Sequence, residues 1–374
     1  MENQIFEIMK QGVEARFAFL KPSISESGFL AGPEKLFDSR WWERSDLWMG
    51  WDNCHYPMHY SFLLQQGVPA LLQRANNGLR SAQTIENRER LQAIIVFLER
   101  FINFIEEHAA LAEKQAQACP ADAERLHLIA SNCRQLSQGA PETFLQGLQL
   151  FYFAWRVRSL NYTSCIGRLD VQLQPLYDKD RADEMTREAA LAYLCELIVK
   201  LNKMGQGDTL MNVMLGGVDE KGQDCTSELS VQIMEAAEKC AMPEPHINVR
   251  IHEHTPAYFW EAVCKLIAKG QGQGTIYLDE AIIPQLVKSG YDLEVARCYA
   301  NDGCTEVTLE GSSDIQFWQV EAMKTLELAL FNGKENPCAP YTPMRKWNRQ
   351  EQSKAYKSQL VFGIESGDMV RDLR

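Results

Sequence analysis

The spacing of apolar residues changes at about residue 160, and this change constrains the fold more than any other feature. After it, short extended runs of mainly apolar residues alternate with longer stretches of helical periodicity. Strands that alternate with helices are typical of βα units arranged as a sheet or barrel. We therefore predict an α/β fold here, with strands near 169–173, 210–215, 247–251 and 275–278 and helices near 186–203, 227–241 and 256–269.

The residues before 160 have a different pattern. Between Leu91 and Ile105, apolar side chains recur at three- and four-residue steps, the spacing of one face of an amphipathic helix. A second helix is expected to start at Pro141, because proline is tolerated in a first helical turn. We thus predict a mainly helical part, 1–160, followed by an α/β part, 161–374, with no evident linker between them.

Composition limits the partners of such a chain. The 374 residues include 38 Lys and Arg against 50 Asp and Glu, a formal net charge of −12. Proteins that bind nucleic-acid phosphates usually show the opposite balance, so nucleic acid is not an expected partner. No apolar stretch approaches the roughly 20 residues of a membrane span, and the N-terminus does not resemble a secretory signal. We expect a cytoplasmic protein whose 11 cysteines are reduced.

The segment most suggestive of chemistry is 301–311, where glycine and polar residues surround Cys304 and Glu306. In an extended chain, residues two apart point the same way, so these two side chains can face one site. A carboxylate raises the pKa of a neighbouring thiol, which opposes its use as a thiolate nucleophile. These residues alone therefore leave open whether Cys304 is catalytic or is a buried structural thiol.

Several further motifs occur in order along the chain. They are Ala140-Pro141-Glu142-Thr143-Phe144, Gly167-Arg168-Leu169-Asp170-Val171-Gln172-Leu173, Gly216-Gly217, Asn248-Val249-Arg250-Ile251-His252 and Gly303-Cys304-Thr305-Glu306. Together they resemble the glycyl radical enzymes, the pyruvate formate-lyase-like superfamily, over about three quarters of the chain. A collinear set of motifs is more specific than one short match, so the resemblance predicts the family.

The resemblance implies a fold and a reaction type. The family fold is a ten-stranded α/β barrel with helices outside, and this chain would form part of such a barrel after its helical N-terminal half. In the family, a stored glycyl radical takes hydrogen from a cysteine, and the resulting thiyl abstracts hydrogen from the substrate. Cys304 matches the thiyl position, and Glu306 matches a carboxylate that acts as a general acid–base. No cofactor would bind directly, and a radical-SAM activating enzyme would be a partner.

The cysteine loop also bears on the branch of the family. Gly303 precedes Cys304, whereas pyruvate formate-lyase itself carries two adjacent cysteines there. The pattern is more similar to the eliminating members, which predicts a lyase or dehydratase acting on a small polar metabolite. A formate acetyltransferase-like activity is one alternative. The family's radical-bearing glycine motif has no match here, so a truncated or split chain acting only with a complementary C-terminal chain is another, and a homodimer is a further partner to test.

Five other residues are candidates for the substrate pocket. Arg168 and Asp170 lie two apart on an expected strand, and Arg250 and His252 have the same spacing. Each pair can contact substrate or can form buried ionic contacts that stabilise the barrel. His55 is shifted from the position of a histidine that many members carry. The polar cluster around it lacks the ligand spacing of a zinc site, so no metal is predicted.

Overall fold

The computed structural model describes residues 4–34, 57–158, 165–203, 211–303 and 305–312, together with 326, 328–330 and 332. Internal contacts divide the chain into two compact units, Met1–Ile315 and Gln316–Arg374. In the second unit, residues 326 and 328–330 are helical. The helices and strands named below all belong to the first unit.

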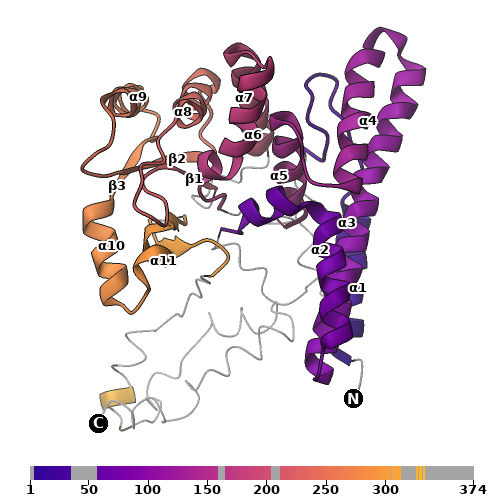
Figure 1. The fold of residues 1–374 in the computed structure, drawn as a ribbon, viewed down its shortest axis with the longest axis horizontal. Coiled ribbons are helices and arrows are strands. Elements are labelled where there is room, and N and C mark those ends of the chain that lie inside the picture. Colours follow the sequence, from indigo (N-terminus) through magenta and orange to yellow (C-terminus); the bar gives the residue numbers. More distant parts are fainter. Residues whose placement is uncertain are drawn as a thin grey trace. The chain divides into compact units, whose positions relative to one another are not determined.

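The first half of the chain forms long helices, as its apolar periodicity predicts. In Figure 1, α3 (Ile85–Ala118) lies alongside α4 (Ala123–Gln138), and it also contacts α2 (Tyr60–Ser81) and α1 (Gln4–Phe19). The hydroxyl of Thr84 accepts the Asn87 amide at 3.1 Å and so caps the start of α3. The short 3-10 helix η3 (Pro120–Asp122) connects α3 to α4.

The helix α5 (Phe144–Arg158) lies at the centre of this helical part. Every residue from Phe144 to Val157 is buried, so α5 is enclosed on all sides. It begins later than the predicted start at Pro141, because Thr143 acts as the capping residue: its hydroxyl accepts the Gln146 amide at 3.2 Å.

The segment 169–173 is helical, and the strand predicted there is wrong. Extended backbone is limited to the residues just before it, where Gly167 forms a parallel bridge to the sheet. The helix α6 (Leu169–Asp183) follows at once. The Glu310 carboxylate accepts the backbone amide of Arg168 at 2.6 Å, at the start of this helix. A carboxylate so distant in sequence leaves no local signal, and this explains the wrong prediction.

The other predicted strands are confirmed, and they form a parallel sheet in the order β1-β2-β3. They are β1 (Asn212–Gly216), β2 (His246–Ile251) and β3 (Thr275–Leu278). The predicted helices are present as α7 (Arg187–Lys203), α8 (Glu228–Cys240) and α9 (Ala257–Ala268). Figure 1 shows α7, α8 and α9 in a row, and the contacts of α8 with both neighbours agree. Strands and helices therefore alternate as βα units.

The sheet has two unlike faces, because successive side chains of a strand point to opposite sides. The face toward the helices carries Val213, Leu215, Ile247, Val249 and Ile251, all buried in the main apolar core. The opposite face carries Asn212, Met214, Asn248, Arg250 and Tyr277, also buried. Parallel sheets are usually apolar on both faces, so the polar face calls for another partner.

That partner is an antiparallel hairpin formed by β4 (Tyr299–Asn301) and β5 (Val307–Leu309). The helices α10 (Asp279–Lys288) and α11 (Leu293–Arg297) connect β3 to it. Tyr299 and Leu309 pack with Met214 and Tyr277 of the sheet in a small second apolar cluster. None of the helices in the described ranges has the length and apolar character needed to cross a membrane.

Candidate functional site

The turn of the β4–β5 hairpin contains the predicted catalytic pair. The Asp302 amide donates to the Glu306 carbonyl at 2.9 Å, and the Thr305 amide donates to the Asp302 carbonyl at 3.1 Å. Thr305 has a φ of 101°, an unusual value for a β-branched residue. Glu306 is partly buried just before β5, and Cys304 lies outside the described residues. The described residues therefore define the backbone on both sides of Cys304.

Two asparagines of the sheet reach this turn. Asn212 Nδ2 donates to the Gly303 carbonyl at 3.5 Å, and Asn248 Nδ2 donates to Asn212 Oδ1 at 2.7 Å. Both side chains are buried. Because Gly303 directly precedes Cys304, the polar face of the sheet contacts the backbone beside the cysteine.

Glu310 anchors the other end of the hairpin. One oxygen of its carboxylate accepts the Arg168 amide at 2.6 Å and the Gln172 side-chain amide at 2.9 Å, at the positive N-terminal end of α6. Burial raises the pKa of Glu310, and the Arg168 amide and guanidinium oppose that rise. Gly167 has a φ of +83°, and a Cβ there would overlap the Glu310 carboxylate. The hairpin is thus fixed both at its turn and after β5.

Arg168 and Asp170, two of the predicted pocket residues, both bind the end of β1. Arg168 Nη2 and Nη1 donate to the carbonyls of Gly216 and Val218 at 2.8 and 2.9 Å. Asp170 Oδ2 accepts the Gly216 amide at 2.8 Å and the Ser230 hydroxyl at 2.6 Å. Burial raises the pKa of Asp170, while the Arg168 charge opposes the rise. The two residues lie at the start of α6 rather than on a shared strand face. Three of these bonds hold the end of β1 and the backbone just after it, and the fourth joins Asp170 to Ser230 of α8 (Glu228–Cys240).

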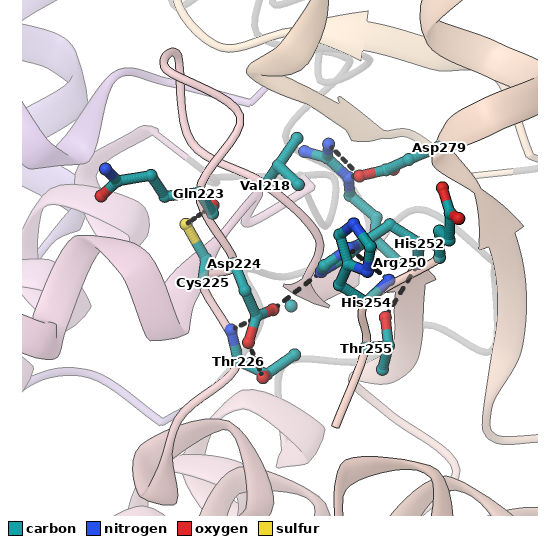
Figure 2. Close-up of polar contacts among 12 residues, drawn as sticks. Val218, Gln223, Asp224, Cys225, Thr226, Arg250, His252, His254, Thr255 and Asp279 are labelled. Atoms are coloured by element: carbon teal, nitrogen blue, oxygen red, sulfur yellow. Dashed lines mark hydrogen bonds and ion pairs between the residues drawn. The ribbon is translucent and has the colours of Figure 1, made fainter. Parts of the chain in front are cut away.

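Arg250 forms a buried network with Asp279 and Tyr299. Its Nε and Nη2 atoms donate to the two Asp279 oxygens, each at 2.8 Å, and its Nη1 donates to the Tyr299 carbonyl at 2.9 Å. The Tyr299 hydroxyl donates to Asp279 at 2.7 Å, and its ring lies 3.9 Å from the guanidinium. A Cβ at Gly217 (φ +75°) would overlap Arg250. This network, whose Arg250–Asp279 pair is visible in Figure 2, joins β2, α10 and β4.

His252 follows β2 and binds the loop between β1 and α8. Its Nδ1 accepts the His254 amide at 3.3 Å, so Nε2 carries the proton donated to Asp224 Oδ1 at 2.9 Å. Asp224 also accepts the Thr226 hydroxyl at 2.6 Å. Figure 2 shows these side chains converging from the loop and from the end of β2. Both ring nitrogens of His252 therefore have protein partners, and His55 lies outside the described residues.

Sequence reasoning missed four residues around the hairpin: Asn212, Asn248, Tyr277 and Glu310. One signal was available, because polar and apolar residues alternate strictly through His246–Ile251. Such alternation is unusual for a parallel strand between helices, and it marks Asn248 and Arg250 as facing something other than an apolar layer. Within the described ranges, no group of three or more His, Cys, Asp or Glu is arranged to bind a metal ion.

The sequence and fold of this chain are similar to those of known proteins. The family model described as pyruvate formate lyase-like matches residues 27–348. The chain belongs to the pyruvate formate lyase-like family. The prediction made from its collinear motifs is therefore confirmed.

Two relatives and one solved structure to which the chain is similar are dehydratases. The (2S)-3-sulfopropanediol dehydratase of Klebsiella oxytoca is 31% identical over 281 residues, covering 69% of this chain and 34% of that protein. The trans-4-hydroxy-L-proline dehydratase of Clostridioides difficile is 28% identical over 314 residues, covering 77% and 40%. The glycerol-bound B12-independent glycerol dehydratase from Clostridium butyricum matches with a TM-score of 0.65 and 28% identity, covering 69% and 35%. The chain thus spans well under half the length of each.

Proposed function

We propose that this chain supplies the thiyl cysteine, Cys304, and the acid–base carboxylate, Glu306, of a glycyl radical dehydratase or lyase. The substrate would be a small polar metabolite that carries a hydroxyl group. The observation that carries the proposal is the β4–β5 hairpin, whose turn lies against the polar face of a parallel sheet. The similarity to dehydratases supports assignment to the dehydratase or lyase branch of the family.

The proposed mechanism uses residues of this turn. The family's glycyl radical supplies the one-electron oxidation of the cysteine thiol. Cys304 then takes a hydrogen atom from a substrate carbon that bears a hydroxyl, and Glu306 accepts the proton of that hydroxyl. Glu306 gives this proton to a second hydroxyl, on the neighbouring carbon, whose C–O bond breaks to release water while the first carbon becomes a carbonyl. Cys304 then returns the hydrogen atom to the neighbouring carbon. The net change is loss of water, with no net oxidation.

The buried side of the turn suits this chemistry. A thiyl radical must be kept from water and from other hydrogen donors, and the sheet and hairpin enclose the turn from one side. The hydrogen bonds from Asn212 to the turn and from α6 to Glu310 limit movement of the backbone around Cys304. Correct placement of a reacting group can account for a large part of a rate enhancement.

We also propose that the sheet β1–β3 forms part of the α/β barrel of glycyl radical enzymes. The helix-covered outer face and the polar inner face support this arrangement, because a barrel interior of this type must admit a polar substrate. The proposal includes a radical-SAM activating enzyme as partner.

The test uses the protein as isolated from its native source, activated anaerobically with its activating enzyme. Wild type is assayed with (2S)-3-sulfopropanediol, trans-4-hydroxy-L-proline and glycerol, and with pyruvate plus coenzyme A. We expect elimination from at least one of the first three. The Cys304→Ser variant should keep the glycyl radical signal in electron paramagnetic resonance but lose turnover, and Glu306→Gln should lower kcat about 10²- to 10⁴-fold.

Cys298 provides the control, since it is a partly buried cysteine just before β4. Cys298→Ser should keep both the radical signal and turnover. Unchanged turnover in Cys304→Ser would contradict the proposal, and acetyl-coenzyme A production from pyruvate would replace it with the acyl-transfer alternative.

A further inference from the structure

Two of the eight cysteines in the described ranges, Cys195 and Cys240, contact each other. Cys195 lies within α7, and Cys240 is the last residue of α8. The Cys240 thiol donates to the Cys195 carbonyl at 3.7 Å, and it also lies within hydrogen-bond reach of the Cys195 thiol. Since α7 and α8 pack directly against each other, both sulfur atoms belong to one helix–helix interface.

The pair lies where a small reagent can reach it. Cys195 and Cys240 are partly exposed, and they pack against the main apolar core from its edge. Cys133 and Cys165, in contrast, are fully buried. Reactivity of a cysteine requires access as well as a thiolate, so the pair at the edge meets a condition that the buried cysteines do not.

The surroundings of Cys240 determine the order in which the two thiols react. Burial raises the pKa of Cys240 to about 12, and the charge and hydrogen bond of Cys195 add to this rise, while Lys239 opposes it. The attacking group in disulfide exchange is a thiolate, so Cys240 is a poor first nucleophile. Once Cys195 is bonded to another sulfur, it can no longer carry a negative charge, and the pKa of Cys240 falls.

We propose that Cys195 and Cys240 form a reversible modification site, at which a small disulfide oxidant converts the two thiols into one disulfide bond. Cys195 attacks the oxidant, whose S–S bond breaks to release one thiol and to leave a mixed disulfide on Cys195. Cys240 then attacks the Cys195 sulfur, releases the second thiol and joins α8 to α7. The two cysteines lose two electrons and two protons, which the two released thiols carry.

The proposed bond would connect two helices of the layer that covers the apolar face of the sheet. A disulfide restricts the unfolded chain, so the oxidised protein should have a higher Tm than the reduced protein. In a reducing compartment such bonds are usually transient and respond to oxidants. The inference is independent of the proposed radical reaction, because neither thiol takes part in it.

Peptide mapping of the full chain tests the inference. The protein is incubated with oxidised glutathione without oxygen, free thiols are blocked with N-ethylmaleimide, and a tryptic digest is analysed by mass spectrometry. Trypsin separates the two cysteines, because peptides 188–200 and 240–250 each contain one of them. We expect these two peptides joined, lighter by two hydrogen atoms than their reduced sum, and separated again by dithiothreitol.

Serine variants test the order of the two steps. Cys240→Ser should stop at the intermediate, with glutathione retained on Cys195, and it should lose the rise in Tm that oxidation gives to wild type. Cys195→Ser should take up glutathione at Cys240 more slowly, because burial still opposes the thiolate there. Cys264 of α9 is the control: it is exposed, and peptide 251–265 carries no other cysteine, so its modification should be the same in all three proteins.

The result for the wild-type protein decides the inference. An unmodified Cys195, or glutathione that stays on Cys195 while Cys240 remains free, would overturn it. So would Cys195 joined to other cysteines as often as to Cys240, because this would show exchange without a preferred partner. Turnover is not measured in this test, so its failure leaves the proposed function unaffected.

Discussion

Both faces of the sheet are buried along β1 and most of β2, but different forces hold the two faces. On the helix-facing side, apolar residues such as Leu215 and Val249 pack in the main core, where the attraction depends on area and has little direction. On the hairpin-facing side, Asn212 and Arg250 make directed hydrogen bonds. Directed bonds specify one arrangement of the partner, so the polar face determines where the cysteine turn lies, while the apolar face supplies stability.

The largest effect is expected from the polar face, at Arg250. Arg250→Met would leave the Asp279 carboxylate buried without its cation, and loss of one partner of a buried pair costs about 3–5 kcal/mol. The free energy of unfolding from urea titration measures this loss. The double variant Arg250→Met/Asp279→Leu should recover much of it, because no unpaired charge remains. A loss below about 1 kcal/mol in the single variant would show that this pair stabilises little.

A large-to-small substitution on the apolar face should lower the free energy of unfolding without changing the position of the β4–β5 turn. Leu215 is fully buried, so Leu215→Ala should cost about 2–5 kcal/mol through lost contacts and a cavity. Below the unfolding transition, the rate of alkylation of Cys304 by iodoacetamide, followed by mass spectrometry, should match wild type. A faster rate in the folded variant would show that the two faces are not independent.

Asn212→Ala should loosen the backbone beside Cys304, which Leu215→Ala should leave in place. It removes the donor to Gly303 and the acceptor for Asn248, at a cost of about 1–3 kcal/mol. Alkylation of Cys304 should become faster than in Leu215→Ala at equal distance from the Tm, because the backbone beside the cysteine is less restrained. Equal rates in the two variants would contradict a positioning role for Asn212.

The smallest expected effect is on the pH dependence of the free energy of unfolding, through the ionisation of Glu310. Burial raises the pKa of Glu310, so the folded state binds this proton more tightly than the unfolded state does. Its contribution to stability is therefore present below the unfolded pKa of about 4.3 and is lost as the pH rises through the folded pKa.

The Glu310→Gln variant tests this pH effect, because its side chain resembles the protonated acid. Its stability should fall less than that of wild type between pH 4 and pH 8, as measured by urea titration at each pH. An identical slope in both proteins would show that Glu310 does not titrate with folding.

Part of the fold was predictable because its signals are local. The strands β1–β3 and the helices α7–α9 were predicted from runs of apolar residues and from helical periodicity. The segment 169–173 was not, because its helix starts against the Glu310 carboxylate, which belongs to the far end of the hairpin. Arg168 and Asp170 were chosen as a pair on a strand, and they lie instead at the start of that helix and contact the end of β1.

The candidate site was predictable to a smaller extent. Ordered motifs predicted the family, whereas the expectation that Cys304 and Glu306 face one site stays a prediction. The sequence could not show that Arg250 binds Asp279 and Tyr299, because three separate elements bring these residues together.

The sequence by itself determined the family, the βα alternation and the alternating pattern of β2. These depend on residues close together along the chain or on motifs in a fixed order. Only the tertiary structure decided which face of the sheet meets the hairpin and which buried polar groups find partners there. Those outcomes depend on contacts between residues far apart in sequence, whose hydrogen bonds form only when the sheet, α6 and the hairpin are packed together.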